Sequence, residues 1–130
     1  MSEGPVARKV KVKYRFFGTL QRELDETFPL ASDERLITEG SVRVRTGIGL
    51  RRLGDLRVTD RRLVLVSHYA LQPDRGLEIP RGSLTKIIRN GSTRTLYFKT
   101  ESGEDRLSIE HDLLVDEALR QWASDASQGL

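Results

Sequence analysis

The chain has 130 residues, a formal net charge of +3 at pH 7 and no cysteine. This length fits one domain that can build a core without disulfides. The lack of cysteine excludes disulfide scaffolds, thiol nucleophiles and thiolate metal sites. Because the sequence has neither a secretory-type apolar segment nor a run of about 18 apolar residues, we expect a cytoplasmic protein that can associate peripherally with a membrane.

Charge is unevenly distributed along the chain. Residues 1–62 carry 14 Lys and Arg against 9 Asp and Glu, a net charge of +5, whereas residues 63–130 carry 8 against 10, a net charge of −2. A basic half of this kind indicates an anionic or acidic partner.

The first predicted element is a strand over residues 8–16, "RKVKVKYRF", whose strict alternation gives one apolar and one basic face. The apolar face has Val10, Val12, Tyr14 and Phe16, and the basic face has Lys9, Lys11, Lys13 and Arg15. The basic face fits an anionic membrane surface, where each residue contributes about 1 kcal/mol. Pairing of this strand with a sheet edge, in its own or a neighbouring chain, is an equally open interpretation.

A short amphipathic helix is expected next. Leu20, Leu24 and Phe28 recur at four-residue spacing, Thr19 can cap the N-terminus, and Pro29 ends the pattern. From residue 36 onward, short apolar runs alternate with turn signals, which indicates an antiparallel sheet. The predicted strands are 36–46, 53–59, 62–68, 77–80, 84–89, 94–100 and 105–110.

The spacing of the apolar residues changes in the last segment. Apolar residues recur at three- and four-residue steps over 112–124, with Asp112 as the expected N-cap, so this segment is predicted to form an amphipathic helix. Residues 125–130 are expected to form a tail.

The segment Gly54 to Leu65, "GDLRVTDRRLVL", resembles the hairpin of GRAM and related bacterial pleckstrin-homology-like domains. Further pieces in the same order resemble this family: "FPLASDERL" at 28–36, Glu78-Ile79-Pro80 followed by Leu84, Ile87 and Ile88, then Leu96-Tyr97-Phe98, Leu107-Ser108-Ile109 and Trp122. The resemblance covers about residues 28–124 and leaves residues 1–27 as an N-terminal extension. It implies a mainly β (α+β) fold: a seven-stranded, bent antiparallel sheet or partly open barrel, capped by a C-terminal helix.

Pleckstrin-homology folds that bind anionic head groups hold them at the loop between the first two strands, so the resemblance points to Arg43, Arg45, Arg51 and Arg52. A guanidinium can donate two parallel hydrogen bonds to a phosphate. The other interpretation is that these are outward residues that keep the sheet soluble. Arg61 and Arg62 follow a turn at the other end of the strands, and we expect them to solvate and position the hairpin.

The sequence predicts no catalysis, metal or cofactor. His68 and His111 lack a recognisable nucleophile setting, and "EHD" at 110–112 lacks a second histidine at ligand spacing. "TGIGLRRLG" fails the nucleotide-binding glycine spacing, and the second motif of PilZ-type cyclic dinucleotide domains is missing. With 8 aromatic residues and no reading motif, a nucleic-acid partner is not expected.

The expected function is therefore non-catalytic binding. One hypothesis is charge-assisted association with an anionic lipid or head group. The alternative is a protein-interaction or homo-oligomerisation module that uses a sheet edge or the apolar face of residues 10–16.

Overall fold

The computed structural model describes residues 4–12, 20–45, 51–68, 74–110, 116 and 118–122. The elements in order are β1 (Arg8–Lys11), α1 (Leu20–Thr27), β2 (Leu36–Arg45), β3 (Arg51–Thr59), β4 (Arg62–Ser67), β5 (Arg75–Pro80), the 3-10 turn η1 (Arg81–Ser83), β6 (Leu84–Asn90), β7 (Thr93–Thr100) and β8 (Gly103–Glu110). Residues 116 and 118–122 are helical, within the helix expected over 112–124. The protein is mainly β.

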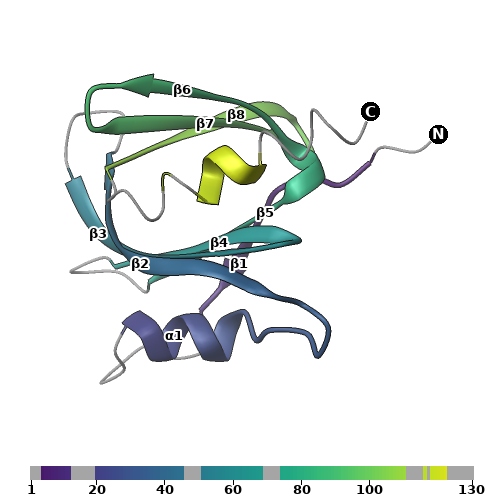
Figure 1. Ribbon diagram of the computed structural model, residues 1–130. Helices are drawn as coiled ribbons and strands as arrows, with labels where there is room; N and C mark the ends of the chain where they lie inside the picture. The colour runs from purple at the N-terminus through teal and green to yellow at the C-terminus, as the bar shows by residue number, and fades with distance from the viewer. Residues whose placement is uncertain are drawn as a thin grey trace.

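All eight strands belong to one antiparallel sheet in the order β1-β5-β4-β3-β2-β8-β7-β6. The sheet does not close on itself, so β1 and β6 are its edges. It bends into two layers, with β6, β7 and β8 above β2, β3, β4 and β5 (Figure 1). The bend lies at β2, which pairs with β3 over most of its length and with β8 only from Arg43 to Arg45.

The main core fills the space between the two layers. Alternation turns Leu56 and Val58 of β3, together with Leu63 and Leu65 of β4, to this inner face, where they are fully buried. The C-terminal helical residues lie in the same space (Figure 1). They contribute Ala118, Leu119 and Trp122.

A smaller core lies between the outer face of the lower layer and α1 (Figure 1). Leu24 of α1 and Phe28, the residue directly after the helix, pack there against Val64 and Val66 of β4, which confirms the amphipathic helix. Gly76 of β5 makes this close approach possible, because a Cβ at this position would lie 3.0 Å from the Phe28 ring.

The N-terminal strand joins its own sheet. β1 pairs with β5, Arg8 opposite Glu78 and Val10 opposite Gly76, and it ends at Lys11 rather than at residue 16. Val10 and Val12 pack into the core between α1 and the sheet, so this part of the apolar face is covered by the chain itself. Residues 13–16, with the predicted sites Lys13 and Arg15, lie outside the described residues.

Candidate functional site

The hairpin formed by β2 and β3 contains the four arginines of the predicted anion site. Arg43 lies opposite Leu53, Arg45 opposite Arg51, and Arg52 opposite the buried Val44. The strand alternation therefore places Arg43 and Arg45 on the outer face and Arg52 on the core side, and the side chain of Arg51 lies outside the described part of the structure. The four predicted arginines therefore do not share one face.

A second correction concerns the start of β3. The sequence placed Arg51 and Arg52 in a connecting loop, whereas both belong to β3, which begins two residues earlier than predicted. The intervening residues 46–50 are not among those described. Because both arginines are in register with β2, they belong to the ladder and not to the loop, and the direction of Arg52 follows from the pleat.

The outer face of the hairpin combines charge with an exposed apolar side chain. Arg43 is exposed, and Leu53 directly across the ladder is 52% exposed. The side chain of Arg45 is 43% exposed and has a long contact of 3.6 Å with Glu110. We name Arg43, Arg45 and Leu53 the hairpin face. It offers cationic side chains around one leucine to an outside partner.

The basic residues of β1 lie elsewhere. Lys9 and Lys11 are exposed, but Lys9 lies opposite Leu77, whose side chain packs against the main core. The two lysines are therefore on the opposite face of the sheet from Arg43 and Arg45. Their neighbour Arg8 forms an ion pair with Glu78. The two predicted basic sites do not form a single surface.

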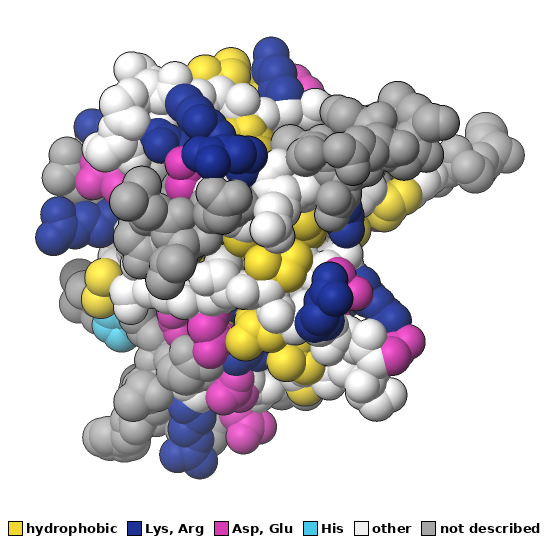
Figure 2. All heavy atoms as spheres, viewed as in Figure 1, with side chains coloured by type: hydrophobic (Ala, Val, Ile, Leu, Met, Phe, Trp, Pro, Cys, Tyr) yellow, Lys and Arg dark blue, Asp and Glu magenta, His cyan; other side chains and the backbone are white. Residues whose placement is uncertain are grey.

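Other arginines of the lower layer have internal partners. Arg57 is 4% exposed and bonds Asp25 of α1 and Glu39 of β2, the latter at 2.8 Å. These bonds hold α1 on the sheet. Figure 2 shows Lys and Arg side chains interleaved with Asp and Glu over one face of the molecule, rather than gathered into a single basic patch.

The two arginines after the β3 turn differ in burial. Arg62 donates to Glu34 at 2.9 Å and to Glu78 at 2.8 Å, and its side chain is 19% exposed. Arg61 is half-exposed and pairs with Asp33. Both therefore stabilise and position the hairpin, as expected. Burial alone would raise the pKa of Glu34, but hydrogen bonds from Arg62, Thr59 and the Ala31 amide lower it to about 2.

Three potential metal ligands that the sequence analysis did not predict meet beside α1. Glu23 of α1, His68 after β4 and Asp74 before β5 bring their ligand atoms within 4.8 Å of one another. His68 Nδ1 lies 3.0 Å from Asp74 Oδ1. Burial, a hydrogen bond with Asp74 and the charge of Asp74 raise the pKa of Glu23 to about 8. We call these three residues the carboxylate–histidine cluster.

A fourth buried carboxyl lies under the same helix. Asp55 of β3 is 4% exposed. Burial and the nearby charge of Glu39 raise its pKa to about 6, although Arg57 acts in the opposite direction. The contact between α1 and the outer face of the lower layer therefore contains ionisable groups as well as apolar side chains.

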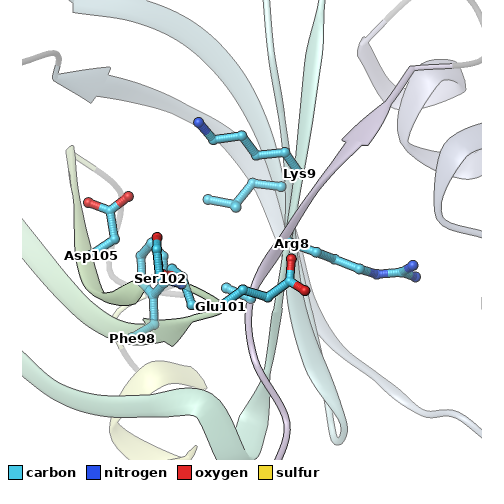
Figure 3. Close-up of a pocket in the computed structure, with 9 residues that line it drawn as sticks. Arg8, Lys9, Phe98, Glu101, Ser102 and Asp105 are labelled. Atoms are coloured by element: carbon cyan, nitrogen blue, oxygen red, sulfur yellow. Dashed lines mark hydrogen bonds between the residues drawn. The ribbon is translucent and has the colours of Figure 1, made fainter.

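A cavity of about 380 Å³ lies at the seam where the sheet fails to close, between β1 and the β7–β8 hairpin. Lys9, Glu101, Ser102 and Asp105 line it above the ring of Phe98, and the Arg8 side chain points away from these residues (Figure 3). Nearby, the Ala7 amide donates to the Lys99 carbonyl oxygen at 2.8 Å. The lining charges are of both signs, so the cavity does not favour anions over cations.

None of the helices within the described ranges is long and apolar enough to cross a membrane. No family model matches the chain, and a search of the curated proteins finds no match. Among solved structures, the chain is similar to the C-terminal domain of an unknown protein from Leishmania infantum, with a TM-score of 0.55 and 20% sequence identity. The match covers 82% of this chain and 96% of that chain. At this identity the likeness extends to the fold alone.

Proposed function

We propose that this chain is a non-catalytic binding module that associates, through charge, with an anionic membrane surface or lipid head group. The hairpin face is the observation that supports this proposal. Arg43 and Arg45 are exposed on the same face as Leu53, although Arg45 also has a contact of 3.6 Å with Glu110, whereas Arg57 and Arg62 are largely buried in ion pairs with carboxylates of their own chain. Cationic side chains bind the phosphates of anionic lipids, and an exposed leucine between them can enter the interface.

We also propose that the fold is pleckstrin-homology-like. Seven strands from β2 to β8, followed by a helical segment with the buried Trp122, are the succession that the resemblance to GRAM domains implies. In such folds the end of the first hairpin receives anionic head groups. The hairpin face lies at this end of β2 and β3.

The expected affinity is low. The two arginines of the hairpin face contribute about 2 kcal/mol near an anionic surface, and partial insertion of Leu53 adds about 1 kcal/mol. A total of about 3 kcal/mol corresponds to a Kd of about 6 mM. Association of this strength is reversible and is lost at high salt, because the Debye length falls from about 30 Å at 0.01 M to about 8 Å at 0.15 M.

Vesicle co-sedimentation tests the proposal. The intact chain is expected to pellet with vesicles of phosphatidylcholine and phosphatidylserine at low salt, but not with phosphatidylcholine alone. Pelleting with both, or with neither, would contradict charge-assisted association.

A protein-interaction function is the second candidate, and the edge strand β6 supports it. Within the described ranges β6 pairs only with β7, so its outer edge is open to another strand. Ile88 on this strand is 43% exposed, and exposed apolar edges accept further strands. If β6 binds a second copy, the molar mass in sedimentation equilibrium will rise with concentration, and Ile88→Lys will abolish that rise. A monomer at every concentration would exclude self-association by this edge.

A further inference from the structure

The carboxylate–histidine cluster is built from three separate elements. Glu23 lies within α1, His68 directly follows β4, and Asp74 directly precedes β5. β4 and β5 are paired up to Ser67 and Arg75, so the residues that flank this pair come together at one end of the ladder. α1 packs over the outer face of β4 and brings its carboxylate to the same end.

Two carboxylates in contact inside a protein are accommodated either by a shared proton, which the raised pKa of Glu23 reflects, or by a bound cation that takes the place of that proton. Glu23 is 2% exposed and Asp74 is 6% exposed. Among the described residues, none donates a hydrogen bond to Oε2 of Glu23. Arg57, the buried cation beneath the same helix, bonds Asp25 and Glu39 instead. One carboxylate oxygen of the buried Glu23 lies within 4.8 Å of the ligand atoms of His68 and Asp74, so Glu23 is placed to ligate a cation together with them.

We propose that Glu23, His68 and Asp74 form a binding site for a divalent transition-metal ion, with Zn²⁺ as its preferred occupant. The donor set supports this assignment, because imidazole nitrogen with carboxylate oxygens suits Zn²⁺, whereas Mg²⁺ and Ca²⁺ favour oxygen alone. The two carboxylates neutralise the charge of the ion.

The distances are compatible with a single ion. Ligand atoms about 2.0 to 2.1 Å from a tetrahedral Zn²⁺ lie about 3.3 Å from one another. The 3.0 Å separation of His68 Nδ1 and Asp74 Oδ1 is close to this value, and all three ligand atoms lie within 4.8 Å of one another. A small contraction towards Glu23 completes three protein ligands, and the half-exposed side of His68 leaves water access to a fourth position.

The site differs from the hairpin face in its residues and its chemistry, and it does not depend on lipid binding. A bound ion would join α1 to the ends of β4 and β5. Binding to the folded chain alone raises its stability by mass action, so an increase in Tm with metal concentration is expected.

The test uses the full chain, stripped of metal with a chelator and dialysed. Isothermal titration with Zn²⁺ should give about one ion per chain and a matching rise in Tm. We expect His68→Gln and Asp74→Asn to weaken Zn²⁺ binding by at least about tenfold, as the loss of a ligand should. His68 is the preferred position, because its side chain is 56% exposed and its replacement should not disturb folding.

The matched control is Glu26→Gln, which removes an exposed carboxylate from the same helix and should bind Zn²⁺ as the original chain does. The assignment would be overturned if the original chain binds no Zn²⁺, if folded His68→Gln binds Zn²⁺ with unchanged affinity, or if the chain binds Mg²⁺ as tightly as Zn²⁺.

Discussion

Trp122 donates its indole N–H to the carbonyl oxygen of Thr59 at 2.9 Å, across 63 positions of sequence. Both residues are buried, and the bond joins the C-terminal helical segment to the end of β3. The Thr59 hydroxyl in turn accepts hydrogen bonds from the Arg61 and Arg62 amides. One threonine therefore links the β3–β4 turn to the helix between the layers.

Trp122→Phe should lower the free energy of unfolding by about 2 to 4 kcal/mol. The substitution leaves the buried Thr59 carbonyl without its donor, which costs about 1 to 3 kcal/mol, and the smaller ring also leaves a void. Urea denaturation measures the change. A loss below about 0.5 kcal/mol would show that this bond does not anchor the helix.

Arg62→Ala and Arg61→Ala form a matched pair of adjacent substitutions. Arg62→Ala leaves the Glu34 carboxylate, whose side chain is 2% exposed, without its cation. Breaking a buried ion pair in this way lowers the free energy of unfolding by about 3 to 5 kcal/mol. Because Arg62 itself is partly exposed, we expect the lower end of that range. The Arg61–Asp33 pair is on the surface, and such pairs contribute about 0 to 1 kcal/mol. If both variants lose the same free energy of unfolding in chemical denaturation, this difference between the buried and the surface ion pair is contradicted.

Glu34 should make the protein sensitive to acid. Its pKa is lowered from 4.5 to about 2 in the folded state, so its contribution is present above pH 4.5 and is lost as pH falls towards 2. Glu34→Gln should reduce stability at pH 7 and flatten the decline between pH 4.5 and 2. Glu101→Gln, at an exposed position, should leave that decline unchanged in thermal melts across this pH range.

The ionisation of Asp55 changes stability with pH in the opposite direction to that of Glu34. Its pKa is raised from 3.8 to about 6, so the folded state favours the protonated form and stability falls as pH rises between these values. Asp55→Asn should remove this decline and stabilise the protein by about 2 kcal/mol above pH 6. If Tm of the variant and of the original chain follow the same course from pH 4 to 7, the buried-carboxyl explanation fails.

Much of the architecture could be predicted from periodicity. Strict alternation and turn residues marked the strands from β2 to β8, and the four-residue spacing of Leu24 and Phe28 marked α1. These signals are local, because each depends on which face of one element is buried. The start of β3 was harder to predict. The strand begins at residue 51 and not at 53, so Arg51 and Arg52 belong to the ladder and not to a loop, and Arg52 lies on the core side.

The ionic contacts beneath α1 could not be predicted in this way. Glu23 lies on the buried side of α1 beside Leu24, and this charged residue in an apolar stripe was the one available signal. Its partners His68 and Asp74 are distant in sequence and are brought to it by the packing of α1 on β4. The ion pairs of the buried Arg57 with Asp25 of α1 and Glu39 of β2 likewise join residues that are distant in sequence.

The most direct test of the central claim compares two charge reversals, one near the end of β2 and one just before its start, in vesicle co-sedimentation. Arg43→Glu changes the hairpin face, and Arg35→Glu changes an exposed arginine just before the other end of β2. At about 0.05 M salt on phosphatidylserine-containing vesicles, Arg43→Glu should weaken binding by about tenfold or more, because it replaces an attraction of about 1 kcal/mol with a repulsion. Arg35→Glu should have little effect. Equal binding by both variants and the original chain would contradict the assignment of the hairpin face as the membrane-binding surface.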